Sequence, residues 1–222
     1  MKISYWIDFN CPYSYIGLTR LNKAIEELKL EDVKLDIHAY ELDPTTSKEP
    51  ITTDKFLLRK YNLGKNGIKE EIEKIEKIAS EDNLTINYKS TPFSNSRDAH
   101  RIVKLAKQYN NQEMINSLVL KLFEEHFKNN VSLSDKEKLI NISTKSGLNK
   151  DEIINVLESK QFDSEVILDE RVAKDTGING TPYFIFYNKY PIPGALPVSE
   201  FINVLKKVKF EEDIVKKYTS KQ

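Results

Sequence analysis

The spacing of apolar residues changes at one cysteine within residues 2–28, KISYWIDFNCPYSYIGLTRLNKAIEEL. Before this cysteine, apolar residues occupy every second position from Ile3 to Phe9, which is the period of a β-strand. After Pro12, they recur at helical spacing as far as Leu28, and proline suits a first helical position because its missing amide proton would have no partner there. The pattern predicts a strand, a turn at Cys11 and a helix.

Cys11 is the only cysteine of the 222-residue chain. A thiol at a helix N-terminus lies near unpaired backbone amides and the positive end of the helix dipole, and both favour the thiolate, the form that attacks sulfur. We therefore expect Cys11 to be reachable by solvent, ionised and reactive. The structural alternative is a buried cysteine that packs as a small hydrophobic residue.

The rest of the chain divides into three parts. A second strand is predicted at residues 33–39, which completes a βαβ unit. Helical periods then dominate residues 52–158, with patterns resembling capping boxes at Ser134–Glu137 and Asn149–Glu152 and a helix-stopping glycine at Gly147. We expect this middle part to be entirely helical.

Strand-forming residues return at 183–187, followed by a turn at 188–189 and a short strand at 190–192, which indicates a hairpin. A last helix begins near Pro197. This order predicts an α/β protein with a thioredoxin-like fold, made of βαβ and ββα halves and carrying a large all-helical insertion. We assign residues 1–51 and 159–222 to the thioredoxin-like domain and residues 52–158 to the helical insertion subdomain.

Five short motifs resemble one protein family. CPYS at residues 11–14 stands where DsbA-family proteins carry their CxxC motif, and GINGTP at residues 177–182 looks like the family's GVxGxP loop with its cis-proline. Further matches are ELDP at residues 41–44, NSRDAHR at residues 95–101 and GALP at residues 194–197. Together they resemble the cytosolic FrnE-like branch of DsbA-type thiol-disulfide oxidoreductases over almost the whole chain.

Two positions depart from that branch. Ser14 replaces its usual second cysteine, and Asn129-Asn130 replaces an acidic-glycine pair. The series from Pro12 to Tyr15 also resembles the kappa-class glutathione transferases and 2-hydroxychromene-2-carboxylate isomerases, which have serine at the position of Cys11. We interpret Ser14 as a natural serine for this reason. The alternative is an engineered replacement of cysteine, a change that traps mixed disulfides.

The resemblance leads to a thiol-disulfide oxidoreductase as the first hypothesis. Cys11, followed by Pro12 and Tyr13 in the active-site motif, would be the nucleophile, and Ser14 would donate a hydrogen bond to its thiolate. Because Ser14 cannot resolve a mixed disulfide, an external thiol such as glutathione must do so. The resemblance further implies that Thr181-Pro182 pairs through its backbone with an extended substrate. No tightly bound cofactor is expected.

Two residues of the matched segment at 95–101 are candidates for substrate binding, because in the family this segment borders the mouth of the active site. Asn95 has a second interpretation as a helix N-cap, with Asp98 three residues later. His100 has a second interpretation as a packed or capping histidine. No metal-ligand companion stands at a suitable spacing from His100, so we expect no metal site.

Composition limits the partners. The 34 basic and 34 acidic residues cancel and form no block of like charge, so we expect neither nucleic acid nor an anionic membrane to bind. No apolar run is long enough for a signal peptide or a membrane span, and one cysteine cannot form an internal disulfide, which together predict a cytoplasmic protein. The expected partners are protein or small-molecule disulfides and thiols, and we allow for a homodimer.

Two other function classes stay open. The first is a glutathione-dependent transferase or isomerase of the kappa type, in which Cys11 would assist the thiolate of bound glutathione. The second is a non-catalytic adaptor that holds a peptide in the groove of a thioredoxin-like fold. A Cys11→Ser variant would abolish disulfide exchange but largely preserve a transferase or isomerase activity.

Overall fold

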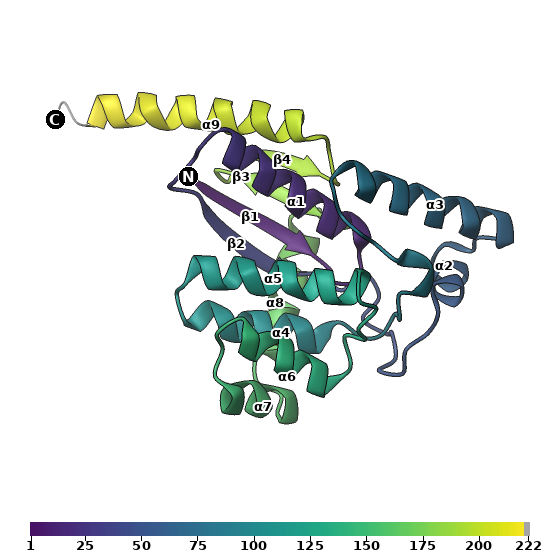
Figure 1. Ribbon diagram of the computed structural model, residues 1–222. Coiled ribbons are helices and arrows are strands. Elements are labelled where there is room, and N and C mark those ends of the chain that lie inside the picture. Colours follow the sequence, from purple (N-terminus) through teal and green to yellow (C-terminus); the bar gives the residue numbers. More distant parts are fainter. Residues whose placement is uncertain (220–222) are drawn as a thin grey trace.

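A four-stranded mixed sheet lies at the centre of the computed structural model, which describes residues 1–219 (Figure 1). The strand order is β2-β1-β3-β4. β1 (Lys2–Ile7) pairs in parallel with β2 (Lys34–Ala39) and antiparallel with β3 (Tyr183–Phe186), which forms a hairpin with β4 (Tyr190–Pro193). The predicted βαβ unit and the predicted hairpin are therefore confirmed, and β1 joins them into one sheet.

Helices make up most of the remaining chain. They are α1 (Pro12–Glu27), α2 (Thr53–Tyr61), α3 (Lys65–Glu81), α4 (Arg97–Gln108), α5 (Gln112–Phe127), α6 (Lys136–Lys145), α7 (Lys150–Glu158), α8 (Asp163–Asp175) and α9 (Val198–Thr219), with a short 3-10 helix, η1, at Tyr88–Ser90. Within residues 1–219, none of these helices is both long and apolar enough to cross a membrane.

The two faces of the sheet are covered by different helices, because successive side chains of a strand point to opposite faces. Ile3, Tyr5 and Ile7 of β1 enter the main core, on the face where α1 and α9 pack side by side. Trp6 points to the other face and packs with Ala173 of α8 in a second, smaller cluster. The result is a sheet between helical layers, as the thioredoxin-like α/β prediction requires.

The helices from α2 to α7 lie between β2 and α8 in the chain, as the predicted helical insertion requires. The main hydrophobic core continues from the sheet into these helices without a break. Phe9, just after β1, packs on Phe123 of α5 with ring centres 4.9 Å apart, and Tyr15 of α1 stacks on the same ring at 5.3 Å. Residues of α5 therefore support the segment that carries Cys11.

The helix boundaries agree with the predicted caps at two of three positions. Asn149 caps α7 by accepting hydrogen bonds from two backbone amides, and Gly147 follows the end of α6 with a φ of +101°. The prediction for Ser134 is wrong, because Asp135 is the N-cap of α6 and accepts a hydrogen bond from the amide of Lys138. A carboxylate one residue later serves the same purpose as the predicted serine hydroxyl.

Candidate active site

Cys11 is the N-cap of α1, at the point where the chain leaves β1. Its amide donates to the carbonyl of Asp8 at 3.0 Å, and its own carbonyl accepts from the amide of Ser14 at 3.0 Å. The predicted arrangement of strand, cysteine and helix is confirmed. The strand is shorter than predicted, ending at Ile7 instead of Phe9, because residues 8–11 form the turn that these hydrogen bonds close.

Thr181 faces Cys11 from the other half of the fold. The Thr181–Pro182 peptide bond is cis, and the Cys11 thiol donates to the Thr181 carbonyl with a sulfur–oxygen distance of 3.4 Å. Gly17 of α1 allows the proline to approach, since a Cβ atom at this position would lie 2.9 Å from Cγ of Pro182. Two segments that are 170 residues apart in the chain therefore meet at the sulfur.

The environment of the sulfur differs from the expectation of a solvent-reachable, ionised thiol. Cys11 is only 4% exposed, and burial raises the pKa of its thiol. The hydroxyls of Thr181 and Ser14 and the amide of Ser14 act to lower this pKa, whereas the charge of Asp8 raises it further. The expectation was wrong because it weighed the helix N-terminus alone, and burial outweighs it.

A small cavity of about 40 Å³ lies beside Cys11. Its walls come from the turn before α1 and from α2, α3 and η1, so the helical block completes the site. The lining side chains are mostly aromatic or aliphatic, and they include Asn10, Tyr13, Phe56, Tyr61, Glu71 and Tyr88. The spacing of residues in the sequence did not single out this wall, because its members come from separate elements.

The other three residues of the CPYS motif have distinct surroundings. Pro12 occupies the first turn of α1 and lines the cavity. Tyr13 donates from its hydroxyl to Oε1 of Glu71 at 3.1 Å, which ties the motif to α3. Ser14 is fully buried, and its hydroxyl accepts from the amide of Asp8 at 3.4 Å. Ser14 is therefore a buried residue of the first turn of α1, and its side chain contacts the preceding turn.

Asn95 lies just before α4, one residue ahead of the observed N-cap, Ser96. Its Oδ1 accepts from the amide of Arg97 at 3.1 Å, and its Nδ2 donates to Oε1 of Glu41 at 3.2 Å. The predicted capping position is therefore wrong by one residue, although the Asn95 side chain does bind an amide of the first turn. Asn95 is not among the residues that line the cavity beside Cys11.

Asp8 is a buried carboxylate that binds the turn before α1. It also contacts His100, one of the residues predicted to bind substrate. Oδ1 of Asp8 accepts from the amide of Asn10 at 3.0 Å and from the hydroxyl of Ser96 at 2.7 Å, and Oδ2 accepts from the amide of Leu42 at 2.7 Å. His100 is 2% exposed, with Nε2 3.7 Å from Oδ1 of Asp8. Burial acts to raise the pKa of Asp8, but His100 and the backbone amides outweigh it and lower that pKa.

The role of Asp8 was missed from the sequence, where the only signal was an acidic residue at the end of a strand. The ring of His100 packs against Phe9, with the two ring centres 5.0 Å apart. It does not line the cavity beside the sulfur. Asp8 and His100 together anchor the Cys11 turn to α4.

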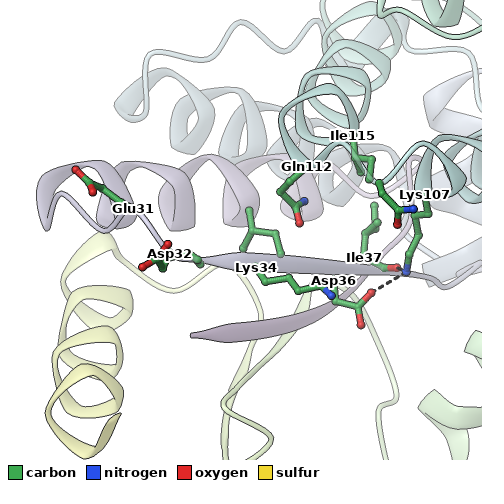
Figure 2. A pocket seen from close by; sticks show the side chains of 11 residues that line it. Glu31, Asp32, Lys34, Asp36, Ile37, Lys107, Gln112 and Ile115 are labelled. Atoms are coloured by element: carbon green, nitrogen blue, oxygen red, sulfur yellow. Dashed lines mark hydrogen bonds and ion pairs between the residues drawn. The ribbon is translucent and has the colours of Figure 1, made fainter. Parts of the chain in front are cut away.

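A larger cleft of about 640 Å³ runs along the outer edge of β2 (Figure 2). It contains none of the predicted site residues, and Lys107 is engaged there with Oδ1 of Asp36 at 2.7 Å and with the carbonyl of Ile37 at 3.0 Å. Within residues 1–219, no group of three or more His, Cys, Asp or Glu side chains could hold a metal ion. We therefore place the candidate site at Cys11, where a thiol, the carbonyl before a cis-proline and a cavity converge.

Comparison with known proteins identifies the family of the chain and structures with a similar fold. Residues 2–206 match the family model of the DsbA-like thioredoxin domain. A structure described as a probable DsbA oxidoreductase from Streptomyces coelicolor superposes with a TM-score of 0.87 at 26% identity, covering 95% of this chain and 91% of that one.

Two more distant structures share the fold. A 2-hydroxychromene-2-carboxylate isomerase superposes with a TM-score of 0.63 at 15% identity, covering 100% of both chains. The cytosolic disulfide reductase DsbM from Pseudomonas aeruginosa superposes with a TM-score of 0.62 at 13% identity, covering 97% of this chain and 99% of that one. No match was found among curated proteins.

Proposed function

The chain belongs to the DsbA-like thioredoxin domain family, and on that premise we propose that it is a thiol-disulfide oxidoreductase with Cys11 as its nucleophile. The observation that supports this most directly is the 3.4 Å contact between the Cys11 sulfur and the carbonyl of Thr181, next to the cis peptide bond. An extended substrate that pairs with the backbone of Thr181 would bring its own sulfur close to that of Cys11.

The proposed reaction is a thiol-disulfide exchange in two steps. Cys11 loses its proton and attacks one sulfur of a disulfide; a bond forms between the two sulfurs, the substrate disulfide breaks, and its second sulfur leaves as a thiolate that takes up a proton. An external thiol then gives up its proton and attacks the substrate sulfur of the mixed disulfide. The bond between the Cys11 sulfur and the substrate sulfur breaks, Cys11 leaves as a thiolate that takes up a proton, and the external thiol departs with the substrate sulfur as a new disulfide.

The surroundings of Cys11 support the first step in a specific way. In the resting state the thiol donates to the Thr181 carbonyl, and burial keeps it protonated. When the proton leaves, the hydroxyls of Ser14 and Thr181 and the amide of Ser14 are in position to stabilise the negative sulfur, since each of them lowers the pKa of Cys11. Reactivity would then depend on these three groups.

Glutathione is the external thiol we propose, in the reducing cytosol. Ser14 leaves no second thiol in the chain to resolve the mixed disulfide, so a small thiol that is abundant in the cytosol is required. DsbM, which shares the fold, is a cytosolic disulfide reductase whose structure was also solved with GSH. His100, which does not line the cavity, is proposed to act through Asp8 on the position of the turn, and Asn95 through the start of α4.

The second candidate is a glutathione-dependent isomerase or transferase. It is favoured by the Pro12-Tyr13-Ser14-Tyr15 series and by the superposition of the 2-hydroxychromene-2-carboxylate isomerase over the full length of both chains. In this reaction Cys11 would donate a hydrogen bond to the sulfur of glutathione and would form no bond to it. A Cys11→Ser variant would keep that donor.

Mass spectrometry after incubation with glutathione disulfide tests the proposal. We expect one glutathione adduct on the wild-type chain, its removal by added glutathione, and no adduct on Cys11→Ser. Turnover is measured as glutathione-dependent reduction of bis(2-hydroxyethyl) disulfide. If Cys11→Ser reduces this disulfide as fast as the wild-type protein, the oxidoreductase proposal is wrong, and an isomerase activity retained by the variant would favour the second candidate.

A further inference from the structure

Asn10, the residue before Cys11, has a buried hydrogen-bond acceptor without a donor. Its side chain is nearly enclosed, because the residue is only 6% exposed. Nδ2 donates to the carbonyl of Ser94 at 2.8 Å, which fixes the orientation of the amide, since the opposite orientation would place two oxygens against each other. Oδ1 accepts no hydrogen bond.

The residue that carries this acceptor lines the cavity beside Cys11. Asn10 and Cys11 both line the space of about 40 Å³, and most of the other walls are apolar or aromatic side chains such as Phe56, Leu57 and Ile75. An unpaired acceptor is costly in such surroundings, where a hydrogen bond is also stronger than in water. The cavity has room for one small group of a bound molecule or for one water.

A second unpartnered polar atom belongs to Thr181, whose carbonyl oxygen accepts from the Cys11 thiol. Oγ1 of Thr181 is inaccessible to solvent and has no hydrogen-bond partner that meets normal geometry, although its hydroxyl acts on the pKa of Cys11. Two residues next to Cys11 thus carry an unpartnered polar atom: Asn10, which lines the cavity, and Thr181, whose hydroxyl acts on the sulfur. Of these two residues, only Asn10 lines the cavity, so its oxygen is the one we assign to a substrate.

We propose that Oδ1 of Asn10 accepts a hydrogen bond from an O–H or N–H group on the carbon chain next to the substrate's sulfur. The site then selects disulfides of hydroxyl-bearing or amide-bearing thiols over disulfides of hydrocarbon thiols. This inference rests on the proposed oxidoreductase function and names its substrate class. It follows from the general rule that a site built around a buried polar group rejects an analogue that leaves the group unpaired.

Two disulfides of nearly equal size test the inference on the wild-type protein. Bis(2-hydroxyethyl) disulfide carries a hydroxyl where dipropyl disulfide carries a methyl group. We measure the rate at which each forms a mixed disulfide with Cys11, and we divide the ratio of rates by the ratio for free cysteine, which removes intrinsic reactivity. The expected preference for the hydroxyethyl compound is at least about tenfold.

The Asn10→Leu variant should lose this preference, because leucine has a similar volume and no acceptor. Asn141→Leu is the matched control, since Asn141 lies on the exposed surface of α6, and it should keep the wild-type preference. If Asn10→Leu fails to fold, the two disulfides on the wild-type chain still decide the matter.

The outcomes separate the inference from the function on which it rests. Equal corrected rates on the wild-type protein would mean that a trapped water already donates to Asn10. A preference that survives in Asn10→Leu would mean that another residue provides it. Either result overturns this inference and leaves the proposed function standing. If neither disulfide forms an adduct with wild-type Cys11, the proposed function fails, and this inference fails with it.

Discussion

Ser14→Ala is expected to raise the pKa of the Cys11 thiol. Ser14 is fully buried, and its hydroxyl is one of the groups that lower the pKa of Cys11. Because the Ser14 oxygen accepts from the amide of Asp8, its proton remains available to the sulfur. Alanine removes a donor that stabilises the thiolate far more than the thiol, so the equilibrium shifts toward the protonated form.

The size of the effect follows from the strength of one hydrogen bond to a charged atom, about 1.5–3 kcal/mol. One pKa unit corresponds to about 1.4 kcal/mol, which gives a rise of about one to two units. The Ser14 oxygen also accepts from the amide of Asp8 at 3.4 Å. The variant also leaves that buried amide without its acceptor, which should lower the free energy of unfolding by about 1–2 kcal/mol.

The assay is the rate of Cys11 alkylation by iodoacetamide as a function of pH, checked against the ultraviolet absorbance of the thiolate. Ser143→Ala is the control, because Ser143 is also fully buried and its hydroxyl has no hydrogen-bond partner. We expect the control to leave the pKa of Cys11 unchanged. A folded Ser14→Ala protein whose Cys11 pKa is unchanged or lower would refute the reasoning.

Three further predictions follow from the same structure. Since burial raises the pKa of Cys11, wild-type alkylation near neutral pH should be slower than that of free cysteine, and a faster rate would contradict the burial argument. Burial lowers the pKa of His126 from 6.5 to about 4, so its contribution to stability is present above pH 6.5 and lost as the pH falls toward 4. Urea unfolding should show that the free energy of unfolding falls by about 3 kcal/mol over this range, and His126→Gln should lack this loss. Equal dependence of the free energy of unfolding on pH in the two proteins would argue against the prediction. Gly17→Ala should lower the free energy of unfolding by about 1–3 kcal/mol and slow adduct formation on Cys11, because the new methyl group would press on Pro182. Thermal unfolding and the rate of adduct formation test this, and an unchanged melting temperature and rate would show that the proline loop moves aside easily.

The parts of the site that could be predicted are those that depend on neighbouring residues. The period of two before Cys11, the proline after it and the period of 3.6 in the following helix all report local backbone geometry, and the structure confirms the order that they predicted. The hairpin after Pro182 was found for the same reason. The position of the cis-proline loop beside Cys11 came from motif resemblance, because no local pattern links segments that are 170 residues apart.

Other parts of the site depend on contacts that spacing does not encode. Asp8 looks in the sequence like a polar residue at the end of a strand, yet in the fold its carboxylate binds the backbone of Leu42 and the hydroxyl of Ser96. Phe56 and Tyr61 of α2 form part of the wall beside Cys11, and the sequence did not predict this either. α2 belongs to the helical block, and no local pattern shows that it packs next to the cysteine in the fold.

From the sequence alone, the order of strands and helices, the thioredoxin-like α/β class and the place of the cysteine at a helix N-terminus were all settled, because each is written in the spacing of residues close together in the chain. The tertiary structure alone decided the protonation of that cysteine. Nearby amides favour the thiolate, but side chains from α2, η1 and the Thr181 loop exclude water from it, and in this fold the loss of hydration has the larger effect on its pKa.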